Sequence, residues 1–431
     1  MPINHSRTLR IGRSSRSAAV GVSLVAALLA GACGNSATQP STGEKRSIGR
    51  ITVPDVPEAD LKATLDRVFT GAAPAVSELD PTVVAALKTA SVPLTPEQKK
   101  IADRCSEESS CDTGTGSVTI AMAESFGQAT RRKVFRREMV EQAVASGRVR
   151  KIIHLDARGD LQTFLSNFRS LVTQNVDVVF SAFDFGASAL PQVKDATAKG
   201  ILVVPVTTGL AGATPGEDYA FDVATDVCSV GTQMAEAAVK AGGENGSAAV
   251  YTGPAGNQYA AQWQPCLKKV LDAHGWKTTL SGNTDWTPQG EAKIAATLAG
   301  SKEKPDALFY DSAPTVLLKA LLDADKPAPF VVSNTATYEY LKFVHDENKK
   351  GTKIDAQVAP FQSWLFRVGV TGALLRLSGE KVADHVQIPS VFAPASTVYD
   401  LAGDGIDTLS PLLPAFPLLD DDVAQSLYQS K

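Results

Sequence analysis

The chain has 431 residues, with 42 basic and 46 acidic side chains and five cysteines. This near balance of charge gives no electrostatic basis for binding nucleic acid. A chain of this length exceeds one ordinary hydrophobic core, so we expect two domains or lobes. After the N-terminal leader, no apolar run reaches the length of about 20 residues that a membrane-spanning helix needs.

Residues 1–32 have the pattern of a signal peptide, because arginines precede a short apolar run that ends in small residues. The run stops at Cys33 and resembles the lipobox of bacterial lipoproteins, with Ala30 where Leu, Val or Ile is usual. The resemblance implies cleavage before Cys33 and lipidation of it, and more than one acyl chain would anchor the protein durably. Ordinary secretion is the alternative. Residues 33–50 are polar and are expected to form a lipid-anchored tether.

The remaining cysteines are even in number, which in an exported protein favours disulfides. They are Cys105, Cys111, Cys228 and Cys266. Three connectivities are possible, and pairing each cysteine with its neighbour in sequence closes the shortest loops. A loop of about 38 residues would stabilise the protein by about 4 kcal/mol on the chain-entropy model. Unpaired buried thiols are the alternative, and the lack of a CxxC spacing argues against a zinc or redox site.

Residues 51–115 form an N-terminal extension with short helical patterns. Leu61, Leu65, Val68 and Phe69 share one helical face, and 95–98 (Thr-Pro-Glu-Gln) has the form of a capping box with proline at the first helical position. No chemistry is visible in this extension. It could pack on the main body or bind a partner, and the sequence leaves both possibilities open.

From residue 117 the chain alternates between strand-like apolar runs and helix-period segments of 12 to 17 residues. Strands are expected at 117–123, 149–155, 177–182, 201–206, 247–253, 276–282, 306–311, 329–334 and 353–360. Helices are expected at 131–146, 160–175, 187–199, 227–241, 257–273, 288–300, 313–324 and 336–348. Such alternation predicts βαβ units and an α/β fold with two doubly wound parallel sheets. The Gly- and Asp-rich passage between the two series carries no helix pattern.

Residues 116–390 resemble the type I periplasmic binding proteins, in the ribose- and sugar-binding branch that serves ABC importers. The resemblance rests on an Asp-Ala-x-Gly-Asp turn at 156–160, a Gln-x-Val-Asp helix end at 174–177 and Lys-Gly-Ile-x-Val-Val at 199–204, with VYTGPAGNQYAAQW at 250–263. It implies two lobes joined by three crossovers, with ligand bound between them. Lobe one would comprise 116–222 plus 361–385 and lobe two 223–360 plus 386–400, followed by a C-terminal tail at 401–431.

Open parallel sheets bind ligands beyond the carboxyl ends of their strands, so residues at those ends are the candidate ligand contacts. Carboxylates and amides suit vicinal hydroxyls, and aromatic rings suit the apolar side of a sugar. Asp184 matches the acid with which the family contacts its ligand. Capping, turn or core roles are the alternatives for each residue. The candidates are Glu124, Phe126, Gln128, Phe183, Asp184, Thr207, Asn257, Asp285, Trp286, Asp311, Asn334, Phe361 and Gln362.

The sequence carries none of the common signatures of enzymes. It contains no GxSxG, HExxH, Walker loop or GxGxxG, and its five histidines are scattered without spaced partners. We therefore expect no catalytic activity, no metal site and no cofactor. Arg131 and Arg132, near the start of a helix, are expected to be solvated and not to face a ligand.

The sequence thus predicts an exported solute-binding lipoprotein on the outer face of the cytoplasmic membrane. It would bind a sugar or similar polar solute and deliver it to ABC permease subunits, with closure of the lobes around the ligand. A cell-surface sensor on the same fold is the main alternative, and a surface protein that has lost its ligand is a third. A transcription regulator of this fold is excluded by the signal peptide and by the lack of a helix-turn-helix.

Overall fold

The computed structural model describes residues 48–128, 130–359, 362–402 and 417–429. All of them belong to one compact unit, Lys45–Lys431. The predicted signal peptide, Cys33 and Phe361 lie outside the described residues. Within the described part of the chain, no helix has the length and apolar character required to cross a bilayer.

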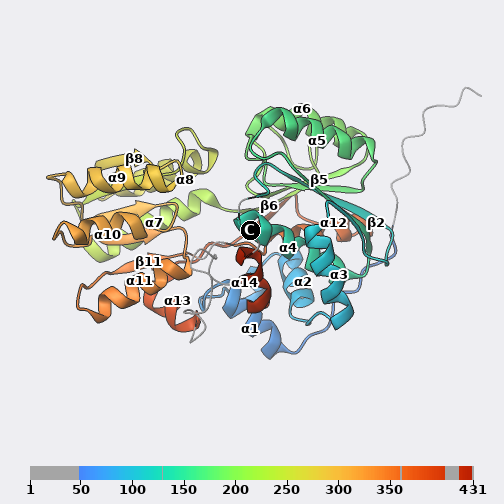
Figure 1. The fold of residues 1–431 in the computed structure, drawn as a ribbon, viewed down its shortest axis with the longest axis horizontal. Coiled ribbons are helices and arrows are strands. Elements are labelled where there is room, and N and C mark those ends of the chain that lie inside the picture. The colour runs from blue at the N-terminus through green and yellow to red at the C-terminus, as the bar shows by residue number, and fades with distance from the viewer. Residues whose placement is uncertain (1–47, 129, 360–361, 403–416, 430–431) are drawn as a thin grey trace, which may run out of the picture. The chain divides into compact units, whose positions relative to one another are not determined.

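The first sheet has seven strands in the order β1-β3-β2-β4-β5-β6-β12. Its strands β2, β5 and β6 are labelled in Figure 1. All neighbouring strands are parallel except β1 and β3, which are antiparallel. The strands are β1 (Ser110–Asp112), β2 (Val118–Glu124), β3 (Val149–Asp156), β4 (Val178–Ser181), β5 (Leu202–Thr207), β6 (Asp222–Thr225) and β12 (His385–Ile388). Helices α4 (Thr130–Ser146) and α12 (Leu365–Leu377) cover one face, and α5 (Leu161–Thr173) and α6 (Leu190–Ala198) cover the other.

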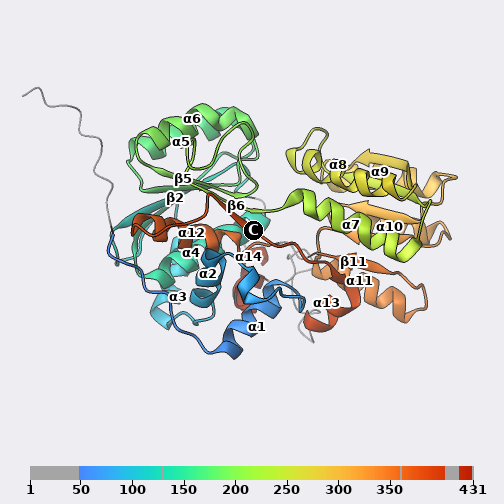
Figure 2. The ribbon, with the colours of Figure 1, turned by 180° about the vertical axis from the view of Figure 1, so that it is seen from behind.

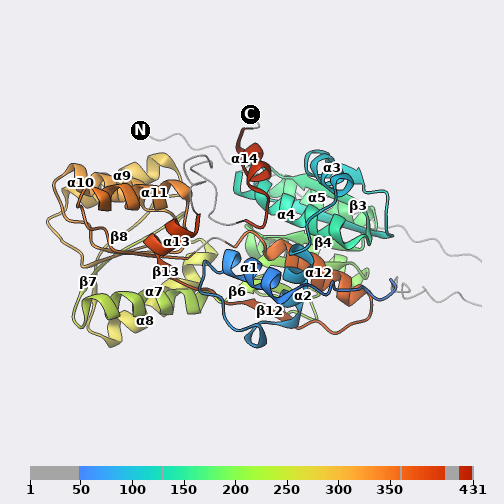
Figure 3. The ribbon, with the colours of Figure 1, turned by 90° about the horizontal axis from the view of Figure 1, so that it is seen from below.

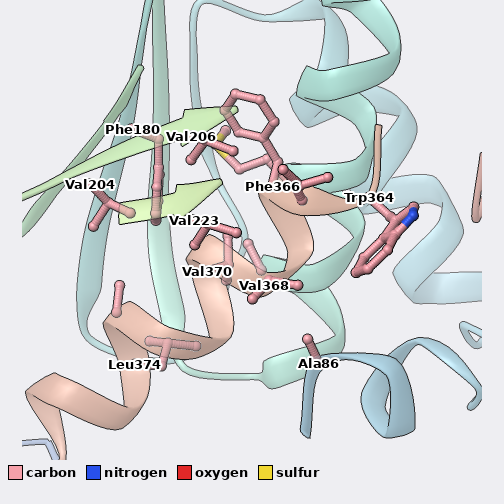
Figure 4. Close-up of a cluster of buried hydrophobic side chains, with 14 of the residues drawn as sticks. Ala86, Phe180, Val204, Val206, Val223, Trp364, Phe366, Val368, Val370 and Leu374 are labelled. Carbon is pink, nitrogen blue, oxygen red and sulfur yellow. The ribbon is translucent and has the colours of Figure 1, made fainter. Parts of the chain in front are cut away.

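Helix α12 is buried along almost its whole length, because the sheet lies on one side of it and the N-terminal helices lie on the other. Its valines and leucines pack against Phe180, Val204 and Val206 of the central strands (Figure 4). At Gly372 an added Cβ would stand 2.7 Å from the Phe221 ring. Glycine at this position therefore lets α12 lie close to Phe221 beside the sheet. Because α12 is covered on both sides, it is an apolar helix without an amphipathic pattern.

The second sheet has six strands in the order β13-β11-β10-β9-β7-β8, of which only β13 is antiparallel to its neighbour. They are β7 (Ser247–Thr252), β8 (Lys277–Asn283), β9 (Ala307–Tyr310), β10 (Phe330–Ser333), β11 (Ala356–Val358) and β13 (Ala393–Pro394). Helices α7 (Val227–Gly242) and α8 (Gln258–Ala273) cover one face. The other face is covered by α9 (Pro288–Gly300), α10 (Thr315–Asp323), α11 (Tyr338–Lys349) and α13 (Ala395–Ala402).

Two disulfides join cysteines that are neighbours in sequence. Cys105 bonds to Cys111, which fastens α3 (Pro96–Glu107) to β1, and Cys228 bonds to Cys266 between α7 and α8. Of the three possible connectivities, the structure has the one that closes the shortest loops. Disulfides in this pattern agree with the exported context inferred from the leader.

The chain passes between the two sheets at three crossovers. They connect β6 to α7, β11 to α12 and β12 to β13. β12 pairs with β6 in the first sheet as far as Ile388, and β13 then begins in the second sheet at Ala393. The passage between the two predicted series carries the short strand β6 at its end, which the sequence pattern did not indicate.

The N-terminal extension packs on the first lobe (Figure 2). It comprises α1 (Glu58–Val68), the 3₁₀ turn Val76–Glu78, α2 (Pro81–Ala90), α3 and the edge strand β1, which pairs with β3. The predicted apolar face is buried. The capping box is confirmed as well, since Thr95 Oγ1 accepts from the Gln98 N–H at 3.2 Å and Gln98 Oε1 accepts from the Thr95 N–H at 2.9 Å. Of the two possibilities for this extension, packing on the main body is the one observed.

The C-terminal segment, residues 417–429, also packs on the first lobe, where α14 (Asp421–Gln429) contacts α4 (Figure 3). Buried charges hold it. The Arg367 guanidinium, on α12, bonds to Glu138 and Glu141 of α4 and also donates to the Leu418 carbonyl at 2.7 Å. Glu138 Oε1 in turn accepts from the Leu418 N–H at 2.8 Å. The segment is thus fixed through its backbone to a buried ionic network.

Candidate ligand-binding site

The candidate residues of the first lobe lie around the carboxyl end of β2. Glu124, the last residue of that strand, accepts from the Arg136 guanidinium at 3.0 and 2.5 Å. Burial raises the pKa of Glu124 to about 7, against the opposing effect of Arg136. Its second oxygen, Oε1, is buried and has no hydrogen-bond partner among the described residues. A buried acceptor without a donor is costly, so this carboxylate is suited to receive a donor from a ligand or a water molecule.

The turn at 156–160 organises the loop after β2. Asp156 accepts from the Gly127 N–H at 2.7 Å, from the Arg158 N–H at 2.9 Å and from the Gln128 side chain at 3.0 Å. Burial acts to raise the pKa of Asp156, but these bonds to the ionised form outweigh it and hold the pKa below its usual range. The side-chain amide of Gln128 is therefore engaged by the protein. Asp156 thus lies among the candidate residues and bonds to two of their loop neighbours, which the sequence did not indicate because Asp156 occurs within a turn motif.

Asp184 follows β4 and forms an ion pair with Arg132 of α4. The Arg132 side chain is only 8% exposed, whereas that of Asp184 is 28% exposed. The expectation that Arg132 is solvated is wrong, because α4 directs this residue toward the strand ends and Phe135 lies beneath its guanidinium at 5.3 Å. Arg131, its neighbour, is exposed as expected. An acid and a base fixed together in this way can accept from one ligand hydroxyl and donate to another.

The aromatic residues of this lobe divide into a core set and an exposed set. Phe183 is buried and packs against Phe164 and Phe168 in the core of the lobe, so its ring does not lie at the surface where a ligand would bind. Phe126 is 44% exposed and stands 5.9 Å, between ring centroids, from Phe185. Phe185 is the aromatic neighbour that sequence reasoning missed, since the strand-end rule points only to the residues directly after the expected strand 177–182.

In the second lobe, Asp311 follows β9 and is almost fully buried. It accepts from Thr252 Oγ1, from Trp263 Nε1 at 3.3 Å and from Trp286 Nε1 at 2.9 Å. Burial raises its pKa, and these hydrogen bonds oppose the rise. Protein donors thus surround a carboxylate that was expected to meet ligand hydroxyls.

Trp286 and Asp285, which follow β8, are exposed and both have positive φ values, of 50° and 54°. The other second-lobe candidates bond within the lobe. Asn257 caps α8 by accepting from the Ala260 N–H at 2.7 Å, and Asn334 donates to the Tyr259 hydroxyl. Asn257 therefore has the capping role that was its alternative.

The crossover residues meet at Gln362. Its side chain accepts from Thr225 Oγ1 at 2.7 Å and donates to the Pro389 carbonyl at 2.9 Å. Thr225 is the last residue of β6 and Pro389 follows β12, so Gln362 connects all three crossovers. Thr207, at the end of β5, is half-buried with a φ of 88°. Gln362 therefore links the crossovers through its side chain, and Phe361 lies outside the described residues.

Two further observations bear on alternative sites. A polar hollow of about 510 Å³ lies beside β12 and the start of α7, with Glu78, Asp226 and His385 in its lining. None of the described candidate residues lines it, although Gln362 bonds to Pro389 of its lining. Among the described residues, no group of three or more histidine, cysteine or acidic side chains is arranged to hold a metal ion. The residues at the strand ends therefore remain the main candidates for ligand binding.

The raised pKa of Glu124 predicts a pH effect on stability. Above the unfolded pKa of about 4.3, the unfolded chain releases the proton while the folded protein retains it, so the stabilisation is present at low pH and is lost by about pH 7. We expect the unfolding free energy of the wild type, relative to Glu124→Gln, to fall by about 1–3 kcal/mol between pH 4.5 and pH 7. His154, whose pKa burial and Arg136 lower to about 4, has the opposite effect in both proteins and cancels in the difference.

Urea unfolding at pH 5, 6, 7 and 8 measures this difference. A difference between the two proteins that stays constant across the series would show that Glu124 is ionised throughout.

Two sheets of mainly parallel strands, three crossovers and polar strand ends define the type I periplasmic binding protein fold. A family model described as "Periplasmic binding protein domain" matches residues 125–360, and the chain belongs to this family. The family expected from the sequence is thereby confirmed. No curated protein sequence matches the chain.

Solved structures share the fold at low sequence identity. One is the periplasmic binding component of the arabinose ABC transporter from Shewanella sp. ANA-3, bound to L-arabinofuranose, with 16% identity and a TM-score of 0.59 over 68% of this chain and 97% of that chain. A Bacillus halodurans C-125 solute-binding protein with bound myo-inositol has 18% identity and a TM-score of 0.56, over 68% and 97%. A Mycobacterium smegmatis protein in complex with β-D-fucofuranose has 16% identity and a TM-score of 0.57, over 68% and 96%.

Proposed function

We propose that this protein is the solute-binding lipoprotein of an ABC importer and that it binds a sugar or polyol between its two lobes. The observation that carries the proposal is the set of polar and aromatic side chains at the strand ends of a periplasmic binding protein fold. Asp184 and Arg132 offer a fixed acceptor and donor, and Phe126 and Trp286 offer exposed ring faces. Vicinal hydroxyls and the apolar face of a sugar ring match these groups.

Binding would use a conformational change about the hinge. Gln362 bonds to both of the other crossovers, so the three strands would move as one hinge when the lobes approach each other. A ligand that contacts both lobes favours the closed state by its difference in affinity for the two states. The closed state is then the form that permease subunits would bind. In this role the protein performs no chemistry on its ligand.

The sugar ligand is tested with a panel taken from the structural relatives. L-arabinose, D-tagatose, D-allose and myo-inositol are the ligands of such relatives or their close forms. A sugar present at a hundred times its dissociation constant adds about 2.7 kcal/mol of stability, which a thermal shift detects. An unchanged melting temperature with every sugar would argue against this ligand class.

Lipid anchoring at Cys33 is part of the proposal. It is supported by the apolar run that ends at this cysteine, and it would hold the protein at the outer face of the cytoplasmic membrane. Metabolic labelling with a fatty-acid analogue should tag the wild type, and Cys33→Ser should lose the label. Equal labelling of both proteins would contradict lipidation at this residue.

A cell-surface sensor is the second candidate. The N-terminal extension and the C-terminal segment add a helical layer to the first lobe, which would give a signalling partner a surface to bind. Genes for a permease and an ATPase beside the coding sequence would favour transport over sensing.

A further inference from the structure

Asp311 accepts its hydrogen bonds from protein groups, which distinguishes it from a residue whose polar atoms are free to bind a ligand. Its Oδ2 accepts from Thr252 Oγ1 and Trp263 Nε1, and its Oδ1 accepts from Trp286 Nε1. A carboxylate has about four lone-pair sites. Three protein donors therefore occupy most of this capacity, and Asp311 is only 8% exposed, so little of the carboxylate is left for ligand hydroxyls.

The bond from Trp286 to Asp311 determines where an exposed indole lies. One face of the Trp286 ring rests on Gly253, where an added Cβ would lie 2.1–2.6 Å from three of the indole atoms. The side chain nevertheless remains 41% exposed, so much of the ring is accessible to solvent. The indole thus packs one side on glycine, its N–H bonds to Asp311, and the rest of its surface is open to solvent. Such a ring is suited to stack against an apolar ligand surface.

The backbone beneath Trp286 is strained. Two consecutive residues other than glycine, Asp285 and Trp286, adopt positive φ values, a conformation that residues with a side chain rarely adopt. A chain of hydrogen bonds maintains it: the Trp286 N–H donates to Thr284 Oγ1 at 3.2 Å, and Thr284 contacts the Tyr310 hydroxyl at 2.7 Å. Strain that persists because its surroundings enforce it is a mark of a functional position.

From these observations we propose that Asp311 is a positioning residue, which acts on the ligand through Trp286 without contacting it. The ligand contact of this part of the second lobe is then the open side of the indole. This inference rests on the proposed function and makes it more specific. The favoured ligand presents a continuous patch of C–H groups, as a pyranose or cyclitol ring does, to the second lobe and directs its hydroxyls toward the first lobe.

The fluorescence of Trp286 can be separated from that of the other tryptophans. The protein has four, and Trp263, Trp276 and Trp364 are each at most 3% exposed. Quenching by acrylamide therefore reports mainly on Trp286. In Asp311→Asn the amide N–H₂ group can no longer accept from one of the indole donors, so we expect Trp286 to become more accessible and its emission to shift to the red.

Gly253→Ala is the second variant, in case Asp311→Asn fails to fold. It leaves the Asp311 carboxylate intact but displaces the Trp286 indole from its position on Gly253, so the same increase in acrylamide quenching is expected. Asp325→Asn is the matched control, since Asp325 is exposed in the turn after α10 of the same lobe and has a positive φ that asparagine tolerates. The control should quench as the wild type does.

The last part of the test measures the affinity of each variant for a sugar. The sugar used is the one that stabilises the wild type most among L-arabinose, D-tagatose, D-allose and myo-inositol. We expect Trp286→Ala to weaken binding about 3- to 10-fold. Asp311→Asn and Gly253→Ala should weaken it to a similar extent, and Asp311→Asn combined with Trp286→Ala should bind no more weakly than Trp286→Ala alone.

The inference is overturned if the double variant binds several-fold more weakly than Trp286→Ala, because Asp311 would then contact the ligand itself. It is also overturned if quenching of Trp286 is unchanged in both Asp311→Asn and Gly253→Ala. If no sugar of the panel binds the wild type, the ligand class proposed above fails. The quenching series then decides by itself whether Asp311 positions the indole.

Discussion

Replacing Arg367 with methionine should lower the unfolding free energy by about 3–5 kcal/mol. The guanidinium is 4% exposed and bonds to Glu138 and to Glu141, the latter at 2.6 Å. Methionine fills much of the same space but leaves two acidic side chains in the interior without this partner. Removing one member of a buried ionic network is costly because the desolvated charges that remain lose their compensation. Arg367 also donates to the Leu418 carbonyl, so the C-terminal segment should loosen as well.

Arg150→Met is the matched control, since Arg150 pairs with Asp112 at the surface, where the two side chains are 50% and 54% exposed. Exposed pairs typically contribute 0 to about 1 kcal/mol. Urea unfolding of both variants measures the difference, and limited proteolysis reports release of residues 417–429. Equal losses of stability in the two variants would contradict a buried network that holds the C-terminal segment.

Replacing Asp184 with alanine should weaken sugar binding by roughly 10- to 150-fold. A hydrogen bond to a charged group contributes about 1.5–3 kcal/mol, and its loss leaves ligand donors unpaired in a site from which water is excluded. The variant also removes the partner of Arg132, whose buried guanidinium is then free to change its position. Both effects act on the same contact surface of the first lobe.

Asp195→Ala is the control for this experiment, since Asp195 pairs with Lys199 on the exposed side of α6, and its side chain is 53% exposed. Its affinity for sugar should equal that of the wild type. Titration calorimetry, together with melting curves of the ligand-free proteins, separates binding from stability. Unchanged affinity in Asp184→Ala with a lowered melting temperature would make Asp184 a structural residue that only holds Arg132.

The fold could be predicted from the sequence because its central strands, such as β2, β4, β7 and β9, are buried on both faces. Such strands form continuous apolar runs, and helix-period segments between them specify parallel sheets. Strands of two to four residues, such as β6, β12 and β13, are too short to show a period and became visible only through their pairing. Helix α4 carries Arg137, Glu138 and Glu141, which are buried in ionic networks and not exposed. A charge run in sequence gives no sign of such partners, because they come from α12 and the extension.

The candidate site could be predicted only as a set of positions. Alternation fixes the direction of a side chain within a strand, but this rule ends where the strand ends. Phe183 has a φ of 46° and packs into the core, which leaves Phe185 beside Phe126. Asp311 meets donors from Trp263 and Trp286, and its role depends on these contacts between residues far apart in sequence.

Calorimetric titration of the folded protein with the four sugars tests the central claim most directly. The account predicts that at least one sugar binds with a stoichiometry of one, and that both Asp184→Ala and Trp286→Ala, one from each lobe, weaken this binding. Loss in both variants would mean that a single ligand is held by the strand ends of the two sheets. Absence of binding by all four sugars, or binding that neither variant weakens, would contradict a sugar site at these positions.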